Sequence, residues 1–252
     1  MTENVPLACH SWGPGPPRVL LIHGLSSAAP VWGRVGKALA AAGFSALAPD
    51  LRGHGASPRG EGYRIEDYTA DVLAACPGPW ALVVGHSLGG AIAVFAAGDD
   101  PAFAEKLLLI DPAIEVDEEV AFAIHDQVVL EASDPPTPKE LLAAHPGWHL
   151  EDAAAKSAAL RATSPEVLSA TVRETQPWAW GSRLTALATP VHILGADPEL
   201  EPLFTEATYR ALVLDKPDLT FAVVPGAGHS IYRDDPATAI AVILDLLDGP
   251  PA

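Results

Sequence analysis

Short runs of apolar residues recur along the chain, and stretches with the 3.6-residue period of an amphipathic helix separate them. Val19–Ile22 and Leu107–Ile110 are apolar at every position, which is typical of strands buried on both faces of a sheet. Strands that alternate with helices predict an α/β fold with a doubly wound, mostly parallel sheet and right-handed crossovers. The strands are expected at 7–12, 18–22, 44–48, 80–84, 105–111, 190–195 and 219–224, and the helices at 31–42, 65–75, 91–97 and 236–247.

Between residues 112 and 189 this alternation stops, and only helical patterns remain. Pro135–Pro138 holds three prolines and predicts a rigid bend, and Ser164 followed by Pro165 is a typical helix start. We therefore expect an all-helical cap at 112–189, inserted into a core made of residues 1–111 and 190–252. The helices of the cap are expected at 116–132, 139–145, 150–162 and 165–175.

The composition of the chain indicates which kinds of molecule it can bind. The chain has 252 residues, 49% of them hydrophobic, and a formal net charge of −17. This charge repels nucleic acid phosphates and anionic membranes, so we expect a small-molecule substrate, with a monomer or a homodimer left open. The N-terminus lacks the features of a signal peptide, no apolar run reaches membrane-spanning length, and two cysteines are too few for a disulfide framework. A cytoplasmic protein fits these observations.

The most specific motif is Gly85-His86-Ser87-Leu88-Gly89-Gly90. It follows an expected strand and precedes an expected helix, the setting of a nucleophile elbow. At such a turn the serine has strained backbone, and the tight turn needs glycine on either side. The hydroxyl of Ser87 is therefore predicted to project from the carboxyl edge of the sheet.

With this motif the chain resembles the α/β-hydrolase family over most of its length. His23–Leu25 ends a strand where that family has its oxyanion loop, and Asp50–Gly55 is similar to the family's D-x-R-G-x-G turn. Acidic and histidine candidates then follow Ser87 in the family's order of serine, acid and histidine. The resemblance implies a serine hydrolase with a catalytic triad.

For the triad, the resemblance and the glycine-rich loop Pro225–His229 indicate His229 as the base that activates Ser87. Asp197, two residues beyond a strand end, is the preferred acid. Asp111, at the end of the strand after the elbow, is the alternative; an aspartate there could also simply cap the turn.

The oxyanion of a tetrahedral intermediate needs preorganised donors. The resemblance implies the backbone N–H groups of Leu25 and Leu88, and Leu88 adds the positive end of a helix. Ser26, the next residue of the same loop, is a candidate for substrate binding.

No cofactor and no metal are expected. No histidine pair has the i, i+4 spacing of a zinc helix and cysteine is scarce. His23, His54 and His86 lie within turn motifs, so we interpret them as structural.

Three of the six tryptophans, Trp148, Trp178 and Trp180, fall within the expected cap. They could form an apolar roof over a substrate, because a tryptophan buries on the order of 200 Å², or they could attach the cap to the core. Trp178 and Trp180 are the stronger candidates for substrate binding, since they precede the return of the chain to the core.

Together these features predict a serine hydrolase that cleaves an ester or lactone of a small, mainly apolar substrate through an acyl-enzyme. A cofactor-free haloperoxidase or perhydrolase, a thioesterase and a carbon–carbon bond hydrolase could use the same triad. A ligand receptor or regulator with little turnover is the alternative from another class, because fold does not fix function.

Overall fold

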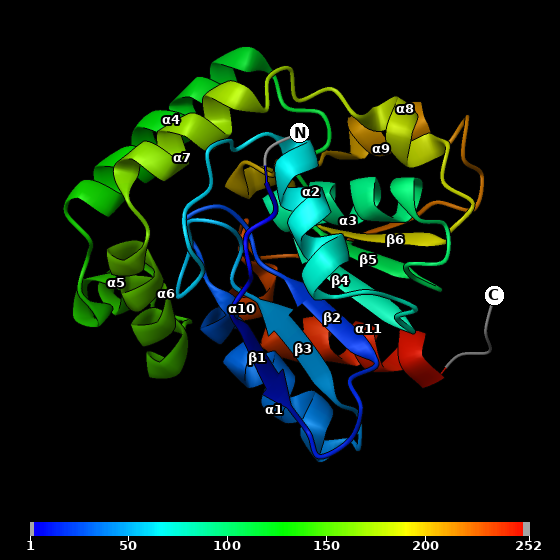
Figure 1. Ribbon diagram of the computed structural model, residues 1–252, viewed down its shortest axis with the longest axis horizontal. Coiled ribbons are helices and arrows are strands. Elements are labelled where there is room, and N and C mark those ends of the chain that lie inside the picture. Colours follow the sequence, from blue (N-terminus) through cyan, green and yellow to red (C-terminus); the bar gives the residue numbers. More distant parts are fainter. Residues whose placement is uncertain (1–2, 249–252) are drawn as a thin grey trace.

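A computed structural model describes residues 3–248; residues 1–2 and 249–252, the two ends of the expected core, lie outside the described part. Seven strands form one sheet in the order β1-β3-β2-β4-β5-β6-β7 (Figure 1). Only β1 is antiparallel to its neighbour, so the predicted mostly parallel sheet is confirmed. The strands are β1 (Cys9–Trp12), β2 (Val19–Ile22), β3 (Ala46–Pro49), β4 (Leu82–His86), β5 (Leu107–Ile110), β6 (Val191–Gly195) and β7 (Thr220–Val223).

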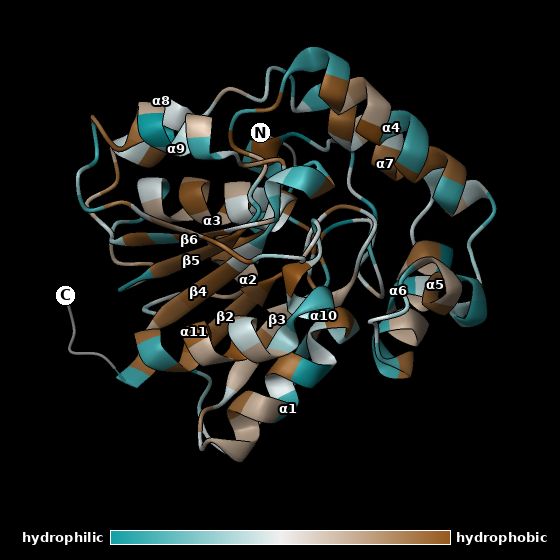
Figure 2. Cartoon of the chain, turned by 180° about the vertical axis from the view of Figure 1, so that it is seen from behind, coloured by the Kyte–Doolittle hydropathy of each residue, from teal (hydrophilic) through white to brown (hydrophobic). Residues whose placement is uncertain are grey.

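Helices cover both faces of the sheet, as the continuous apolar strands require. In β2, Leu20 and Ile22 pack into the core on one face, whereas Val19 and Leu21 pack into a second core on the other. The first core lies under α2 (Ile65–Ala75) and α3 (Leu88–Asp99), and the second lies under α1 (Gly33–Ala41) and α11 (Pro236–Asp248). Figure 2 shows the apolar strands between these helical layers.

A helical insertion separates β5 from β6, as expected. It contains four longer helices, α4 (Glu118–Ser133), α5 (Pro138–Ala144), α6 (Leu150–Ala162) and α7 (Pro165–Glu174), and ends with the short α8 (Gly181–Thr185). In Figures 1 and 2, α4 lies along α7, and α5 lies beside α6, at one side of the sheet. Side chains define the helix starts: the Ser164 hydroxyl accepts a hydrogen bond from the N–H of Val167, and Thr137 forms a capping box with Glu140.

Several short elements were not predicted. They are the helices α8 (Gly181–Thr185), α9 (Glu206–Leu212) and α10 (Ile231–Asp234), and the 3₁₀ turns at Ala29–Trp32 and Pro198–Leu200. Each is too short to show a helical period in the sequence. Within residues 3–248, no helix is long and apolar enough to cross a membrane.

Candidate active site

The elbow connects β4 directly to α3 and has the geometry that its motif predicts. Ser87 has φ of 54° and ψ of −119°, in a region that residues other than glycine rarely adopt. A Cβ atom on Gly85 would overlap the carbonyl of Gly89, and one on Gly89 would overlap the carbonyl of Ile22. Both positions therefore need glycine for the strand, turn and helix to pack this closely.

The loop after β2 lies directly against this elbow. A Cβ atom on Gly24 would lie 3.0 Å from the Cβ of Ser87 and 2.8 Å from Nδ1 of His86. Leu25, the next residue, is half-buried. Leu88 is the first residue of α3, so its N–H has no partner within the helix. The two backbone amides expected to bind an oxyanion thus belong to segments that touch each other at Ser87.

His229 is paired with Asp111. Its Nδ1 lies 2.7 Å from Oδ2 of Asp111. The Asp111 carboxylate is fully buried and also accepts hydrogen bonds from the amides of Leu203 and Phe204, at 3.1 and 3.0 Å. These two amides fix the carboxylate, and the carboxylate in turn orients the imidazole. Because Nδ1 is engaged in this pair, Nε2 is the nitrogen left for a second partner.

The expectation that Asp197 pairs with His229 is therefore wrong. The Asp197 carboxylate accepts hydrogen bonds from the amides of Gly226, at 2.7 Å, and Glu199, at 3.0 Å. These bonds lower the pKa of Asp197, and they brace the start of the histidine loop rather than the imidazole.

The hydrogen bonds of the backbone explain why Asp111 lies nearer to the elbow. The N–H of Ser87 donates to the carbonyl of Ile110, and the N–H of Ala113 donates to the carbonyl of Ser87. Asp111 lies between these two bonds, at the end of the strand next to β4 in the sheet. Asp197 follows β6, which is one strand farther away.

His86 joins the elbow to the histidine loop. Its Nε2 donates to the carbonyl of His229 at 2.9 Å, and the two rings lie 4.6 Å apart between centroids. Burial, followed by the nearby His229, lowers the pKa of His86 well below its usual value. Within residues 3–248 the Ser87 hydroxyl makes no hydrogen bond to His229, so the His86 bond is the direct polar link between the two segments.

His23 and His54 bind backbone, as expected of structural histidines. His23 contacts the carbonyl of Gly24 through Nδ1, and its Nε2 accepts from the N–H of Leu51. His54 contacts the carbonyl of Arg52. Burial is the main reason that their pKa values are lowered, to about 4 for His23 and about 3 for His54. No cluster of potential metal ligands occurs among the described residues.

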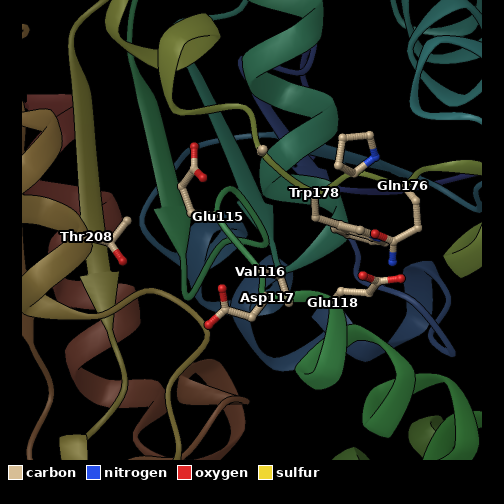
Figure 3. A pocket seen from close by; sticks show the side chains of 9 residues that line it. Glu115, Val116, Asp117, Glu118, Gln176, Trp178 and Thr208 are labelled. Atoms are coloured by element: carbon tan, nitrogen blue, oxygen red, sulfur yellow. The ribbon is translucent and has the colours of Figure 1, made fainter.

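Trp148 is apart from the other two tryptophans of the expected cap, whereas the rings of Trp178 and Trp180 lie 5.2 Å apart between centroids. Trp148 donates from Nε1 to Asp234 on α10 at 2.6 Å, so it attaches the insertion to the core. Trp180 packs edge-on against Phe95 of α3. Trp178 lines a pocket of about 550 Å³ where the two ends of the insertion meet α9, shown in Figure 3. The lining consists of Glu115, Val116, Asp117, Glu118, Gln176, Pro177, Trp178, Ala179 and Thr208.

Two basic residues that the sequence did not single out contact the oxyanion loop. Lys156 of α6 donates from Nζ to the Oγ of Ser26 at 2.8 Å and to its carbonyl at 3.1 Å. Arg233 of α10 reaches the Oγ of Ser27 at 3.5 Å. Lys156 occupies an ordinary position within a helix, so only the tertiary structure reveals this contact. Arg233 follows His229 by four residues, a proximity that could have drawn attention to it.

Comparison with known proteins agrees with this architecture. Lipase LipV of Mycobacterium tuberculosis is 40% identical over 119 residues, which span 45% of this chain and only 44% of LipV. The 2-(acetamidomethylene)succinate hydrolase of Mesorhizobium japonicum is 26% identical over 262 residues, covering 92% of this chain and 88% of that protein. A crystal structure of E-2-(acetamidomethylene)succinate hydrolase shares the fold, with a TM-score of 0.82 over 99% of both chains at 23% identity.

A family model extends this similarity over nearly the whole core. It represents the alpha/beta hydrolase family and matches residues 19–242, which include the elbow, the loop after β2 and the Asp111–His229 pair. The protein therefore belongs to the alpha/beta hydrolase family.

Proposed function

We propose that the protein is a serine hydrolase that cleaves a carboxylic ester or lactone through an acyl-enzyme. Ser87 is the nucleophile, His229 is the general base, and Asp111 orients the imidazole and stabilises its protonated form. The amides of Leu25 and Leu88 bind the oxyanion. The fixed Asp111–His229 pair beside a strained serine is the observation that carries this proposal.

In the acylation step, Nε2 of His229 takes the proton of the Ser87 hydroxyl as Oγ attacks the carbonyl carbon. The tetrahedral intermediate collapses when His229 returns this proton to the leaving alcohol, and the ester bond to Ser87 remains. Water then attacks the acyl-enzyme in the same manner, which releases the acid and restores Ser87. No metal or cofactor takes part in these steps.

Two relatives support a hydrolase. LipV is named a lipase, and the Mesorhizobium protein, which aligns along most of this chain, is named a hydrolase. The helical insertion is proposed to be a cap that covers the site, because both Trp148 and Lys156 join it to segments beside Ser87 and His229.

The direct test is hydrolysis of p-nitrophenyl esters of increasing acyl length by the wild type and by Ser87→Ala. We expect loss of at least about a thousandfold in kcat for the variant, as is usual when a nucleophile is removed. A fluorophosphonate probe should label the wild type and leave Ser87→Ala unlabelled. Equal turnover by the two proteins would refute the proposal.

A further inference from the structure

Two cationic side chains converge on the residues that directly follow the proposed oxyanion donor Leu25. Lys156 comes from the insertion and binds Ser26, whereas Arg233 comes from α10 and reaches Ser27. The cations therefore approach the same loop from the insertion and from the core. Neither contact is needed for the proposed triad, so this pair requires a separate explanation.

Arg233 is buried without a counter-ion. The residue is only 3% exposed, and within residues 3–248 no carboxylate lies within 4.0 Å of its guanidinium. Its polar contacts are two hydroxyls, Ser230 at 3.2 Å and Ser27 at 3.5 Å. Its Nε has no hydrogen-bond acceptor among the described residues. A buried charge without a counter-ion is costly, so an anion that binds beside Arg233 would be stabilised.

The aromatic residues packed around Arg233 also include a buried donor without an acceptor in the described part of the chain. The guanidinium of Arg233 lies 4.9 Å from the ring centroids of Tyr232 and Trp148, and Trp32 stacks on Tyr232 with 4.3 Å between the ring centroids. The Trp32 Nε1 also has no hydrogen-bond partner among the described residues, and the Tyr232 hydroxyl faces Ser27 and Arg233. Two buried N–H donors in one packed cluster, Arg233 Nε and Trp32 Nε1, thus lack an acceptor, which buried polar groups rarely do.

Lys156 adds positive charge that its neighbours neutralise only in part. Its one anionic neighbour within 4.0 Å in the described chain is Glu131, at 3.7 Å, beyond hydrogen-bonding distance. Lys156, Arg233 and Glu131 sum to one positive charge around Ser26 and Ser27, and the buried Asp50 carboxylate accepts the N–H of Ala29 farther along the same loop at 2.7 Å. Burial lowers the pKa of Lys156 to about 8; Glu131 opposes this shift and Arg233 adds to it.

We propose that the substrate carries a carboxylate, which Lys156 and Arg233 bind beside the oxyanion loop. This inference rests on the proposed function, which supplies the reacting carbonyl at Ser87. A carboxylate provides acceptor oxygens and negative charge together, and its hydrogen bonds to lysine and arginine are among the stronger ones in proteins. The side chain of Lys156 keeps 13% exposure, so it is the cation that an entering ligand meets first. The substrate class is a short acid-bearing ester or lactone, rather than the mainly apolar substrate expected from the sequence.

Matched pairs of esters test this inference. Monoethyl succinate and ethyl butyrate differ by a carboxylate in place of a methyl group, and monoethyl glutarate and ethyl valerate extend the pair by one methylene. We expect the wild type to prefer the charged ester of at least one pair by about tenfold or more in kcat/KM, measured by titration of the released acid. In Lys156→Met this ratio should fall by about tenfold, and in Lys156→Arg it should be largely retained.

Lys37→Met is the matched control. Lys37 also joins the core to α6, through an exposed ion pair with Glu151. The substitution therefore removes a cation from the same interface without changing a contact of the oxyanion loop. In Lys37→Met the ratio of kcat/KM for the charged ester to that for the neutral ester should equal the wild-type ratio. Equal ratios in the wild type and Lys156→Met, or a preference for the neutral ester in both pairs, would overturn the carboxylate inference while the proposed hydrolysis stands.

If the wild type cleaves neither member of either pair, the p-nitrophenyl ester assay still decides the proposed function, and a binding measurement decides the carboxylate inference separately. Isothermal titration of Ser87→Ala with monoethyl succinate and monoethyl glutarate measures affinity without turnover. We expect at least one half-ester to bind, with about tenfold weaker binding in Ser87→Ala/Lys156→Met. No binding, or binding that the second substitution does not change, would reject the carboxylate site.

Discussion

At the scale of single residues, the site depends on backbone positions that few side chains can occupy. Ser87 and Asp111 both have positive φ, 54° and 39°, and such strain persists only where the surroundings fix it. Hydrogen bonds around the elbow supply this constraint, because Ser87 is bonded to Ile110 and Ala113 on either side of Asp111. Ser87 and Asp111, the proposed nucleophile and acid, are therefore positioned by one shared turn of backbone.

Asp111 and Asp197 each follow a strand, but replacing them by asparagine should affect kcat very differently. Asp111→Asn should reduce kcat on a p-nitrophenyl ester by about a thousandfold or more, because the amide cannot stabilise the imidazolium. Asp197→Asn should keep turnover close to the wild type, since within residues 3–248 this carboxylate accepts hydrogen bonds only from the amides of Gly226 and Glu199. Circular dichroism checks that both variants fold. A severe loss in Asp197→Asn with a mild one in Asp111→Asn would reverse the assignment.

Some residues of the site could be predicted from the sequence, and others could not. Ser87 and the loop at Gly24 were predictable because tight local turns demand particular residue types. The choice between Asp111 and Asp197 depends on which strand lies beside β4, and an aspartate at either strand end looks the same in sequence. Lys156 lies 130 positions from Ser26, and no local pattern reports a contact of that kind.

At the scale of elements, Asp234 on α10 connects the insertion to the histidine loop. Its Oδ1 accepts the Trp148 N–H of the insertion at 2.6 Å, and its Oδ2 accepts the N–H of Gly228 at 2.9 Å. Gly228 precedes His229 directly. The position of α5 and α6 is thus coupled to the loop that carries the proposed base, through a short helix that the sequence did not predict.

Removal of this bond should loosen the insertion. In Trp148→Phe a smaller aromatic ring replaces the indole and the donor is lost, at a cost of about 1.5–3 kcal/mol for a hydrogen bond to a charged group. We expect amide hydrogen exchange across α5 and α6 to become faster, with α3 unchanged, as measured by mass spectrometry. Trp180→Phe, which alters packing against α3 instead, should leave exchange in α5 and α6 unaltered. Unchanged exchange in Trp148→Phe would show that the bond does not hold the insertion in place.

At the scale of the whole molecule, the parallel sheet gathers the strand ends, and with them a set of buried histidines. His23 follows β2, His54 lies in the turn after β3, and His86 ends β4. All three have lowered pKa values, with burial as the largest cause. Their rings stay neutral in the folded state at pH values where those of the unfolded chain are protonated.

The protein should therefore lose stability as the pH falls below about 6.5. Between about pH 6 and pH 4 the unfolded chain binds up to three more protons at these rings, so the free energy of unfolding should fall by up to about 4 kcal/mol per pH unit. Urea denaturation at several pH values measures this slope. His54→Asn, which keeps a donor for the carbonyl of Arg52, should reduce the slope by about a third. His10→Asn, on the exposed edge strand β1, should leave it unchanged, and a free energy of unfolding that is constant from pH 7 to pH 5 would show that these rings do not stay neutral.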